Sequence, residues 1–324
     1  MTIMVGRSYL SSLAIHVIMA GSDVDSEREA SEGQMSSTTG PTDGHPVQLI
    51  HEGQDRLYLL HIPPTVPAEG LPLVLGLHGR GIDAAWFDRL TGYSSLVEEA
   101  GFVLALPNVL NERWNDGRDP SVEPSGGPDD VGYLAAVIDD VIARLPIDER
   151  RIYVVGLSSG ASMAGRLACE LVERIAAVAQ VAGTAAVGVA AGCRPPRPVP
   201  ILNIHGSADP YAPYAGGTRR SLRGRLLLRP ASRPMVGVDA WARFWVAANG
   251  AIDGPLVSTL PPDTTIRTWH GPSPASDVVF ARIEGGGHTW PGGHPTLPGL
   301  LFGRTSRAFS ATRVSWDFFA AHTR

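Results

Sequence analysis

The segment that most restricts the fold is an apolar run that leads into a serine framed by glycines. Residues 151–157 read as a buried strand and continue into Gly156-Leu157-Ser158-Ser159-Gly160. Small residues then recur at helical spacing through residues 161–168, so a helix can pack closely beneath the turn. The glycines are needed because larger side chains would clash with the sharp turn. The pattern predicts Ser158 as a nucleophile at the carboxyl edge of a sheet; the alternative is a Gly/Ser turn without chemistry.

Other apolar runs alternate with amphipathic segments along the chain. A hairpin is expected at residues 47–62, buried strands at 71–79, 102–106, 152–155, 176–181, 199–204 and 278–283, and helices at 129–145, 238–248 and 314–321. Strands that alternate with helices in this way form a mostly parallel sheet covered on both faces. We therefore predict a three-layer α/β sandwich with helices on both sides of the central sheet.

The first 46 residues are predicted to precede the folded domain. Residues 9–19 form a moderately apolar run after Arg7, and this run fits a degenerate signal peptide and a disordered leader equally well. Residues 21–46 have the composition of a flexible linker. Because no second linker interrupts residues 47–324, we expect one catalytic domain there. No later run is apolar and long enough to span a membrane.

Composition excludes several kinds of chemistry. All 27 basic residues are Arg, so a Schiff-base lysine, a Ser-Lys dyad and a P-loop lysine are ruled out. The net charge of −5 argues against a nucleic-acid partner. Two cysteines, Cys169 and Cys193, are too few for a Cys-based zinc site, and they could form one disulfide or remain free. We expect no metal and no cofactor, so catalysis must depend on Ser, His and carboxylates.

A serine nucleophile needs a base and an acid, which follow it along the chain in the order acid, then His, in this fold. Asp209 ends the run at 200–210, and His288 lies in a Gly-rich loop after the strand at 278–283. Both therefore fall at the carboxyl edge and are our candidate acid and base. Their competitors are weaker because of chain order or position, and they are Asp263, Asp277, His205 and His294.

The remaining site residues are predicted from the neighbouring loops. Two backbone N–H groups must bind the oxyanion, and we expect them from Ser159 and Arg80, with Gly79 as the alternative to Arg80. Aromatic side chains in these loops suit an aryl or apolar substrate, although ordinary packing would explain each ring equally well. The candidate substrate-binding rings are Trp86, Trp114, Tyr211, Tyr214 and Trp290.

These motifs together resemble a known family. The resemblance is carried by Leu77-His78-Gly79, Asp129-Asp130-Val131-Gly132-Tyr133-Leu134, Gly156-Leu157-Ser158-Ser159-Gly160, His205-Gly206-Ser207-Ala208-Asp209, Gly285-Gly286-Gly287-His288-Thr289-Trp290-Pro291-Gly292-Gly293 and Trp316-Asp317-Phe318-Phe319. The chain is similar to the polyhydroxybutyrate depolymerase and feruloyl esterase group of α/β-hydrolases. That resemblance implies an α/β-hydrolase fold and a cofactor-free, exported ester hydrolase whose nucleophile, acid and base are Ser158, Asp209 and His288. It also favours a Cys169–Cys193 disulfide, whereas Ala251 stands where family members often carry another Cys.

We therefore expect a serine carboxylesterase that works through an acyl-enzyme. Its substrate is expected to be a feruloyl, aryl or short-chain ester, and the alternative is a polyhydroxyalkanoate or another polyester. A peptidase or an acyltransferase is a further possibility in the same fold, and a non-catalytic binding module is the alternative from another class. An extracellular or periplasmic location and a monomeric state are favoured, and the expected partner is the ester alone.

Overall fold

A computed structural model of the 324-residue chain describes residues 44–118, 127–218, 233–294 and 299–324. A single mixed sheet of ten strands runs through these residues in the order β1-β2-β4-β3-β5-β6-β7-β10-β9-β8. Neighbouring strands from β4 to β10 in this order are parallel, and the strands outside them pair antiparallel. The carboxyl ends of the central strands therefore meet at one edge, where the loops of the candidate site begin.

The strands carry the apolar runs seen in the sequence. The most buried strands are β3, β4, β6 and β7, because helices cover both of their faces. The ten strands are β1 His45–His51, β2 Gln54–His61, β3 Leu71–Leu77, β4 Val103–Pro107, β5 Ile147–Leu157, β6 Ala177–Val181, β7 Ile201–Gly206, β8 Asp253–Leu260, β9 Thr264–His270 and β10 Val278–Ile283.

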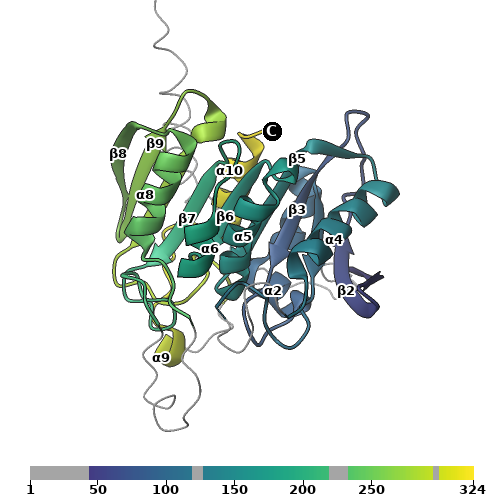
Figure 1. Cartoon of the computed structure of the whole chain (residues 1–324), viewed down its shortest axis with the longest axis horizontal. Helices are drawn as coiled ribbons and strands as arrows, with labels where there is room; N and C mark the ends of the chain where they lie inside the picture. The colour runs from purple at the N-terminus through teal and green to yellow at the C-terminus, as the bar shows by residue number, and fades with distance from the viewer. Residues whose placement is uncertain (1–43, 119–126, 219–232, 295–298) are drawn as a thin grey trace, which may run out of the picture.

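Helices cover the sheet in two layers. One apolar cluster joins the sheet to α4 (Asp130–Arg144), α5 (Ser159–Glu170) and α8 (Val238–Asn249), which lie in front of the sheet in Figure 1. A second cluster joins the opposite face to α2 (Ala84–Thr91), α3 (Tyr93–Ala100) and α10 (Ala311–Ala320). The short elements are η2 Val172–Arg174, α6 Val187–Gly192, η3 Pro274–Ser276 and α9 Gly299–Phe302.

Local sequence explains why these helices begin where they do. The Asp129 carboxylate accepts a hydrogen bond from the Gly132 N–H and caps α4. Its negative charge also interacts favourably with the positive end of the helix dipole. Asp83 caps α2 in the same way through the Trp86 N–H. The apolar stripe of α4 then faces the sheet, since its buried residues recur every three to four positions.

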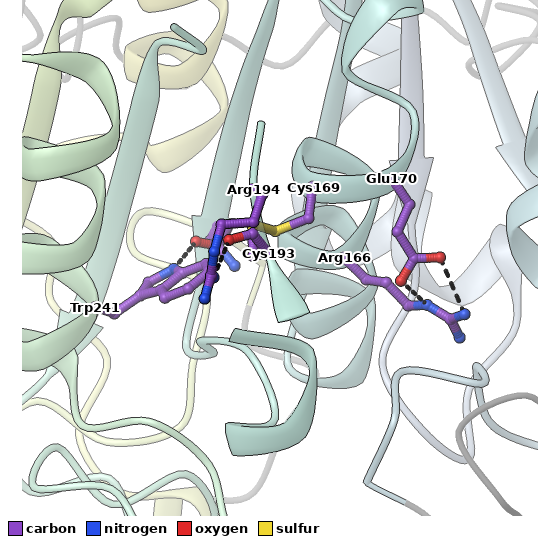
Figure 2. Close-up of a disulfide and its surroundings, with 7 residues drawn as sticks. Arg166, Cys169, Glu170, Cys193, Arg194 and Trp241 are labelled. Atoms are coloured by element: carbon purple, nitrogen blue, oxygen red, sulfur yellow. Dashed lines mark hydrogen bonds and ion pairs between the residues drawn. A yellow bond between two sulfur atoms is a disulfide. The ribbon is translucent and has the colours of Figure 1, made fainter. Parts of the chain in front are cut away.

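A disulfide ties the front helical layer together. Cys169, near the end of α5, is bonded to Cys193, which follows α6 directly (Figure 2). The bond closes a segment with a sequence separation of 24 residues. The pairing that the family resemblance favours is therefore present, and the described residues contain no other cysteine.

The predicted fold class is confirmed, and the elements differ from expectation in a few places. Strand β5 begins at Ile147 rather than near residue 151 because a polar stretch extends it beyond the apolar run. Helices α2 and α3 and the antiparallel strands β8 and β9 were not anticipated, since short or half-exposed elements carry a weak apolar pattern. The predicted leader and linker at residues 1–46 lie outside the described residues except for 44–46, and β1 begins at His45.

Candidate active site

Ser158 lies on a tight turn between β5 and α5. Its backbone adopts φ 57° and ψ −114°, a strained conformation for a residue with a side chain. Close packing holds the turn in place. A Cβ added at Gly156 would lie 2.3 Å from the backbone of Gly160, and one added at Gly160 would lie 2.0 Å from the Leu77 carbonyl oxygen. Only glycine fits at these two positions, so the serine projects where the sequence predicted.

Three side chains from distant loops meet at this turn. His288 Nε2 lies 2.8 Å from Ser158 Oγ, and His288 Nδ1 lies 2.7 Å from Asp209 Oδ2. Because the carboxylate can only accept, Nδ1–H donates to Asp209 and Nε2 is left to accept the serine proton. Asp209 and His288 are both buried. The structure thus joins the three residues in the geometry that activates a serine hydroxyl.

The surroundings of Asp209 keep it ionised. Burial alone would raise the pKa of its carboxyl group, but the hydrogen bond from His288, the charges of His288 and His205 and the Ala212 N–H outweigh burial and lower the pKa below its usual range. The Tyr211 and Ala212 N–H groups donate to Oδ1 at 2.7 and 2.8 Å. These two bonds leave Oδ2 for the imidazole, so the loop both orients the Asp209 carboxylate and stabilises its negative charge.

The competing acids occupy other roles. Asp263 accepts hydrogen bonds from Thr264 and Ser306 and pairs with Arg304. Asp277 precedes β10, at the opposite edge of the sheet from Ser158, and binds His270 at 2.8 Å.

The competing histidines are also engaged elsewhere. His205 is buried at the end of β7, with Nε2 2.8 Å from the Ala212 carbonyl oxygen and 3.6 Å from Asp209 Oδ2. Burial is the largest influence on the pKa of His205 and lowers it below its usual value. His294 is exposed, and its backbone N–H donates to the carbonyl oxygen of Leu90 in α2. Neither ring has a hydrogen bond with Ser158 among the described residues.

The two serines of the turn differ in their contacts. Ser159 is the first residue of α5, and its buried Oγ has no hydrogen-bond partner in the described part of the chain. Its N–H is among the first N–H groups of a helix, which lack an acceptor within the helix. Across the turn, a Cβ added at Gly79 would lie 3.4 Å from the Ser158 Cβ. The loop of Gly79 and Arg80 therefore runs directly beside the candidate nucleophile.

Two of the predicted substrate-binding rings lie in the core instead. Trp114 is only 1% exposed, and its Nε1 donates to the His78 carbonyl oxygen. Trp290 is also 1% exposed and packs edge-on against Phe87. A ring that is sealed by neighbouring side chains offers no surface to a substrate, so the prediction is wrong for these two residues and ordinary packing is observed.

The other three rings keep partial exposure. Trp86 packs against the apolar cluster of α2 and remains half-buried. The Tyr214 hydroxyl donates to Asp239 and accepts from Arg267, so this ring is tied to α8 and β9. Tyr211 is half-buried, and its ring centroid lies 5.2 Å from that of His288. Of the five predicted rings, Tyr211 is therefore the one packed against the candidate base.

Sequence reasoning missed two residues near the site. Phe302, the last residue of α9, stacks on Tyr211 with a centroid distance of 5.0 Å, and its carbonyl oxygen accepts from the His288 N–H. Gln180 on β6 is fully buried; it donates to the Ala161 carbonyl oxygen in α5 and accepts from Trp241. A lone amide inside the apolar run at 176–181 was a signal for Gln180, whereas no local pattern marks Phe302.

Among the described residues, no group of three or more His, Cys, Asp or Glu side chains is arranged to hold a metal ion. No described helix is long and apolar enough to cross a membrane.

Comparison with known protein sequences identifies relatives. Residues 56–194 match the family model described as esterase PHB depolymerase. A protein assigned as the esterase NocK of Nocardia uniformis is 32% identical over 280 residues, which cover 84% of this chain and 81% of that protein. A protein assigned as feruloyl esterase C of Aspergillus niger is 28% identical over 279 residues, which cover 78% of this chain and 96% of that protein.

Solved structures share the fold. Acetyl xylan esterase from Aspergillus awamori has a TM-score of 0.53 at 16% identity and covers 76% of this chain and 94% of its own. A thermostable esterase has the same TM-score of 0.53 at 18% identity, with 87% of this chain and 64% of that chain covered. At these identities the likeness establishes the α/β-hydrolase architecture.

Proposed function

The chain belongs to the PHB depolymerase family of esterases and is a carboxylic ester hydrolase, and from that premise we propose that Ser158, His288 and Asp209 perform the hydrolysis. The observation that carries the proposal is the continuous relay between them, with 2.8 Å from Ser158 Oγ to His288 Nε2 and 2.7 Å from His288 Nδ1 to Asp209 Oδ2. A serine hydroxyl is a poor nucleophile unless a positioned base accepts its proton.

The reaction proceeds through an acyl-enzyme. Ser158 Oγ attacks the ester carbonyl carbon while its proton passes to His288 Nε2. The tetrahedral intermediate then collapses, and the same proton is given to the departing alcohol. A water molecule repeats the sequence on the acyl-enzyme, with His288 again as base, and releases the acid. Asp209 remains ionised throughout and stabilises the imidazolium, in keeping with the lowered pKa of its carboxyl group.

The oxyanion of the intermediate is bound by two backbone N–H groups. One is that of Ser159 at the start of α5, where the helix dipole also favours negative charge. The other comes from the loop after β3, for which Arg80 is our choice and Gly79 the alternative. The close approach of Gly79 to Ser158 supports this loop as the source of the second donor.

We infer that the substrate is a feruloyl, aryl or short-chain ester. Support comes from the likeness over 279 residues to the protein assigned as feruloyl esterase C. A polyester such as polyhydroxybutyrate is the second candidate, because the matching family model is described as an esterase PHB depolymerase. A side-by-side panel of methyl ferulate, short p-nitrophenyl esters and a polyhydroxybutyrate film would rank these substrates.

Two adjacent serines allow a sharp test of the nucleophile. Ser158→Ala removes the attacking oxygen, and we expect kcat for p-nitrophenyl acetate to fall by about 10⁴-fold or more. Ser159→Ala keeps the N–H that binds the oxyanion and removes a hydroxyl that has no hydrogen-bond partner among the described residues, so its rate should stay within a few-fold of wild type. Equal rates for Ser158→Ala and wild type would refute the mechanism. Fluorophosphonate labelling of the same proteins should follow the rates.

We further propose that the enzyme works in an oxidising compartment, outside the cell or in the periplasm. The Cys169–Cys193 disulfide supports this, since disulfides persist chiefly in such compartments. Mass spectrometry of the protein recovered from culture medium and from cell extract would test the location and would identify its N-terminal residue.

A further inference from the structure

Three aromatic rings pack together at the candidate base. Tyr211 and Phe302 are stacked with centroids 5.0 Å apart and an angle of 18° between their planes. The His288 ring lies 5.2 Å from Tyr211 and 6.5 Å from Phe302. Tyr211 and Phe302 come from different loops, one after β7 and the other from α9, which projects at the lower end of the view in Figure 1.

Both rings keep part of their surface exposed, because neither is sealed in the core. Tyr211 and Phe302 are half-buried, in contrast to the buried Trp114 and Trp290. Apolar surface also continues along α9 from Phe302, since Leu300 and Leu301, at 102% and 60% exposed, are among the most exposed apolar side chains of the described residues. An exposed apolar cluster next to a reacting group is unusual unless it binds something.

The direction of proton transfer decides which part of an ester these rings meet. In acylation the bond between the carbonyl carbon and the alkoxy oxygen breaks, and its electron pair goes to the alkoxy oxygen. The proton that left Ser158 Oγ then passes from His288 Nε2 to that oxygen. The departing alcohol must therefore lie within hydrogen-bond reach of the imidazole, while the acyl group stays on Ser158.

From this geometry we propose that Tyr211 and Phe302 form the wall that binds the alcohol portion of the ester and sets the enzyme's leaving-group selectivity. The inference rests on the proposed function of Ser158 and His288 and adds the substrate part that each surface recognises. Flat or apolar alcohols, such as aryl and benzyl groups, fill the contact with stacked rings best. The acyl group is selected elsewhere, because it extends from the carbonyl carbon away from the imidazole.

The test compares Phe302→Ala with wild type in two series of esters, one that reports alcohol selectivity and one that reports acyl selectivity. One series holds the acyl group constant with methyl, butyl and benzyl acetate, and the other holds the alcohol constant with methyl acetate, butyrate and benzoate. We expect the benzyl-to-methyl ratio of kcat/KM to fall by about tenfold, the scale on which apolar contacts discriminate substrates. The ratios in the acyl series should stay within about twofold. Phe302→Tyr, which keeps the ring, should retain the wild-type alcohol ratio.

Phe244→Ala is the matched control. Phe244 is also a half-buried ring in a stacked pair, 5.0 Å from Trp241, but it lies on α8 in the front helical layer. Its removal should change neither series. Should Phe302→Ala lose all activity, Phe302→Leu removes the ring while keeping apolar volume and is read by the same two ratios.

A second measurement follows from reversibility. An alcohol that attacks the acyl-enzyme occupies the same wall as a departing alcohol, so Phe302→Ala should lower transfer of the acetyl group to benzyl alcohol relative to water by a similar factor. Transfer to methanol should be unchanged relative to water.

The outcomes distinguish this inference from the proposed function. An unchanged alcohol ratio in Phe302→Ala, or an equal loss on every ester, would overturn the wall, the latter because it would show that the ring only supports His288. If Phe302→Ala gives either of these results while Ser158→Ala is inactive in the same assays, only the proposed wall is refuted and the proposed function stands. If Ser158→Ala is as active as wild type, the proposed function fails instead.

Discussion

Gly160→Ala tests how closely the turn at Ser158 depends on packing. A Cβ at this position would lie 2.0 Å from the Leu77 carbonyl oxygen and 2.6 Å from that of His78. A Cβ atom does not lie closer than 3.0 Å to a heavy atom of a non-neighbouring residue in real structures. Because the close-packed interior cannot absorb this overlap, α5 must move away from β3 by about 1 Å. That shift moves Ser158 and the Ser159 N–H relative to the loop at residues 78–80.

Displacement of this size at the reacting groups costs about 100-fold in rate. We therefore expect kcat/KM of Gly160→Ala for p-nitrophenyl acetate to fall by at least about 100-fold, with a loss of about 1–3 kcal/mol in the free energy of unfolding. Steady-state hydrolysis and urea unfolding measure the two effects. The variant must remain folded at the assay temperature, which circular dichroism checks.

Gly188→Ala is the control for the same chemical change. Gly188 lies on α6, and no heavy atom lies within 4 Å of a Cβ added there. Its activity should equal that of wild type, and its unfolding free energy should rise by up to about 1 kcal/mol, since alanine restricts the unfolded chain. A Gly160→Ala enzyme that is folded and within twofold of wild type in rate would refute the packing argument.

Three further predictions concern charge and cross-linking. Asp209→Asn should lower kcat by about 10⁴-fold, because an amide neither holds the required imidazole tautomer nor stabilises the imidazolium; a loss under tenfold would contradict this. Replacement of Cys169 and Cys193 by Ala should lower the unfolding free energy by about 3 kcal/mol in urea titration, since it frees the closed segment in the unfolded chain; an unchanged midpoint would count against it. Asp277→Asn breaks the buried contact with His270 and should cost about 3 kcal/mol. Burial would raise the Asp277 pKa, but the hydrogen bond from His270 lowers it. The contribution of Asp277 to folding stability is therefore present above its usual pKa of 3.8 and is lost as the pH falls through its pKa in the folded protein. The same hydrogen bond raises the His270 pKa. The contribution of His270 to folding stability is therefore present below its usual pKa of 6.5 and is lost as the pH rises through its pKa in the folded protein. The Tm difference from wild type should therefore be largest between about pH 4 and 6.5, and a flat difference across pH would oppose the assignment.

The accuracy of the sequence-based predictions depended on how local the relevant interactions are. The turn at Ser158 was predictable because strand, glycines and helix are neighbours in the chain, and their spacing alone dictates the geometry. Asp209 and His288 were predicted as acid and base from chain order, which the α/β-hydrolase topology imposes on loops at one sheet edge, and the structure brings both side chains to Ser158. The Cys169–Cys193 pair was open from residue counting, and only the family resemblance favoured it before the structure paired the two sulfur atoms.

Predictions for the aromatic residues were less successful because burial is not a local property. Trp114 and Trp290 lie in loops, which suggested exposure, but both loops fold back over apolar helices and seal the rings. Phe302 was not predicted as a site residue, since no pattern in the neighbouring sequence indicates a contact with His288. Its contact with Tyr211 arises only because α9 and the loop after β7 fold against the same imidazole.

By itself the amino-acid sequence determined the chemistry open to this protein. A chain without lysine, with a glycine-framed serine after a buried strand, is restricted to serine, histidine and carboxylate catalysis on an α/β sheet. The tertiary structure decided which rings are buried and which stay partly exposed beside His288, because that depends on how loops separated by tens to hundreds of residues pack against one another. Backbone hydrogen bonding and apolar periodicity act over a few residues, whereas exposure at the site follows from the packing of the whole fold.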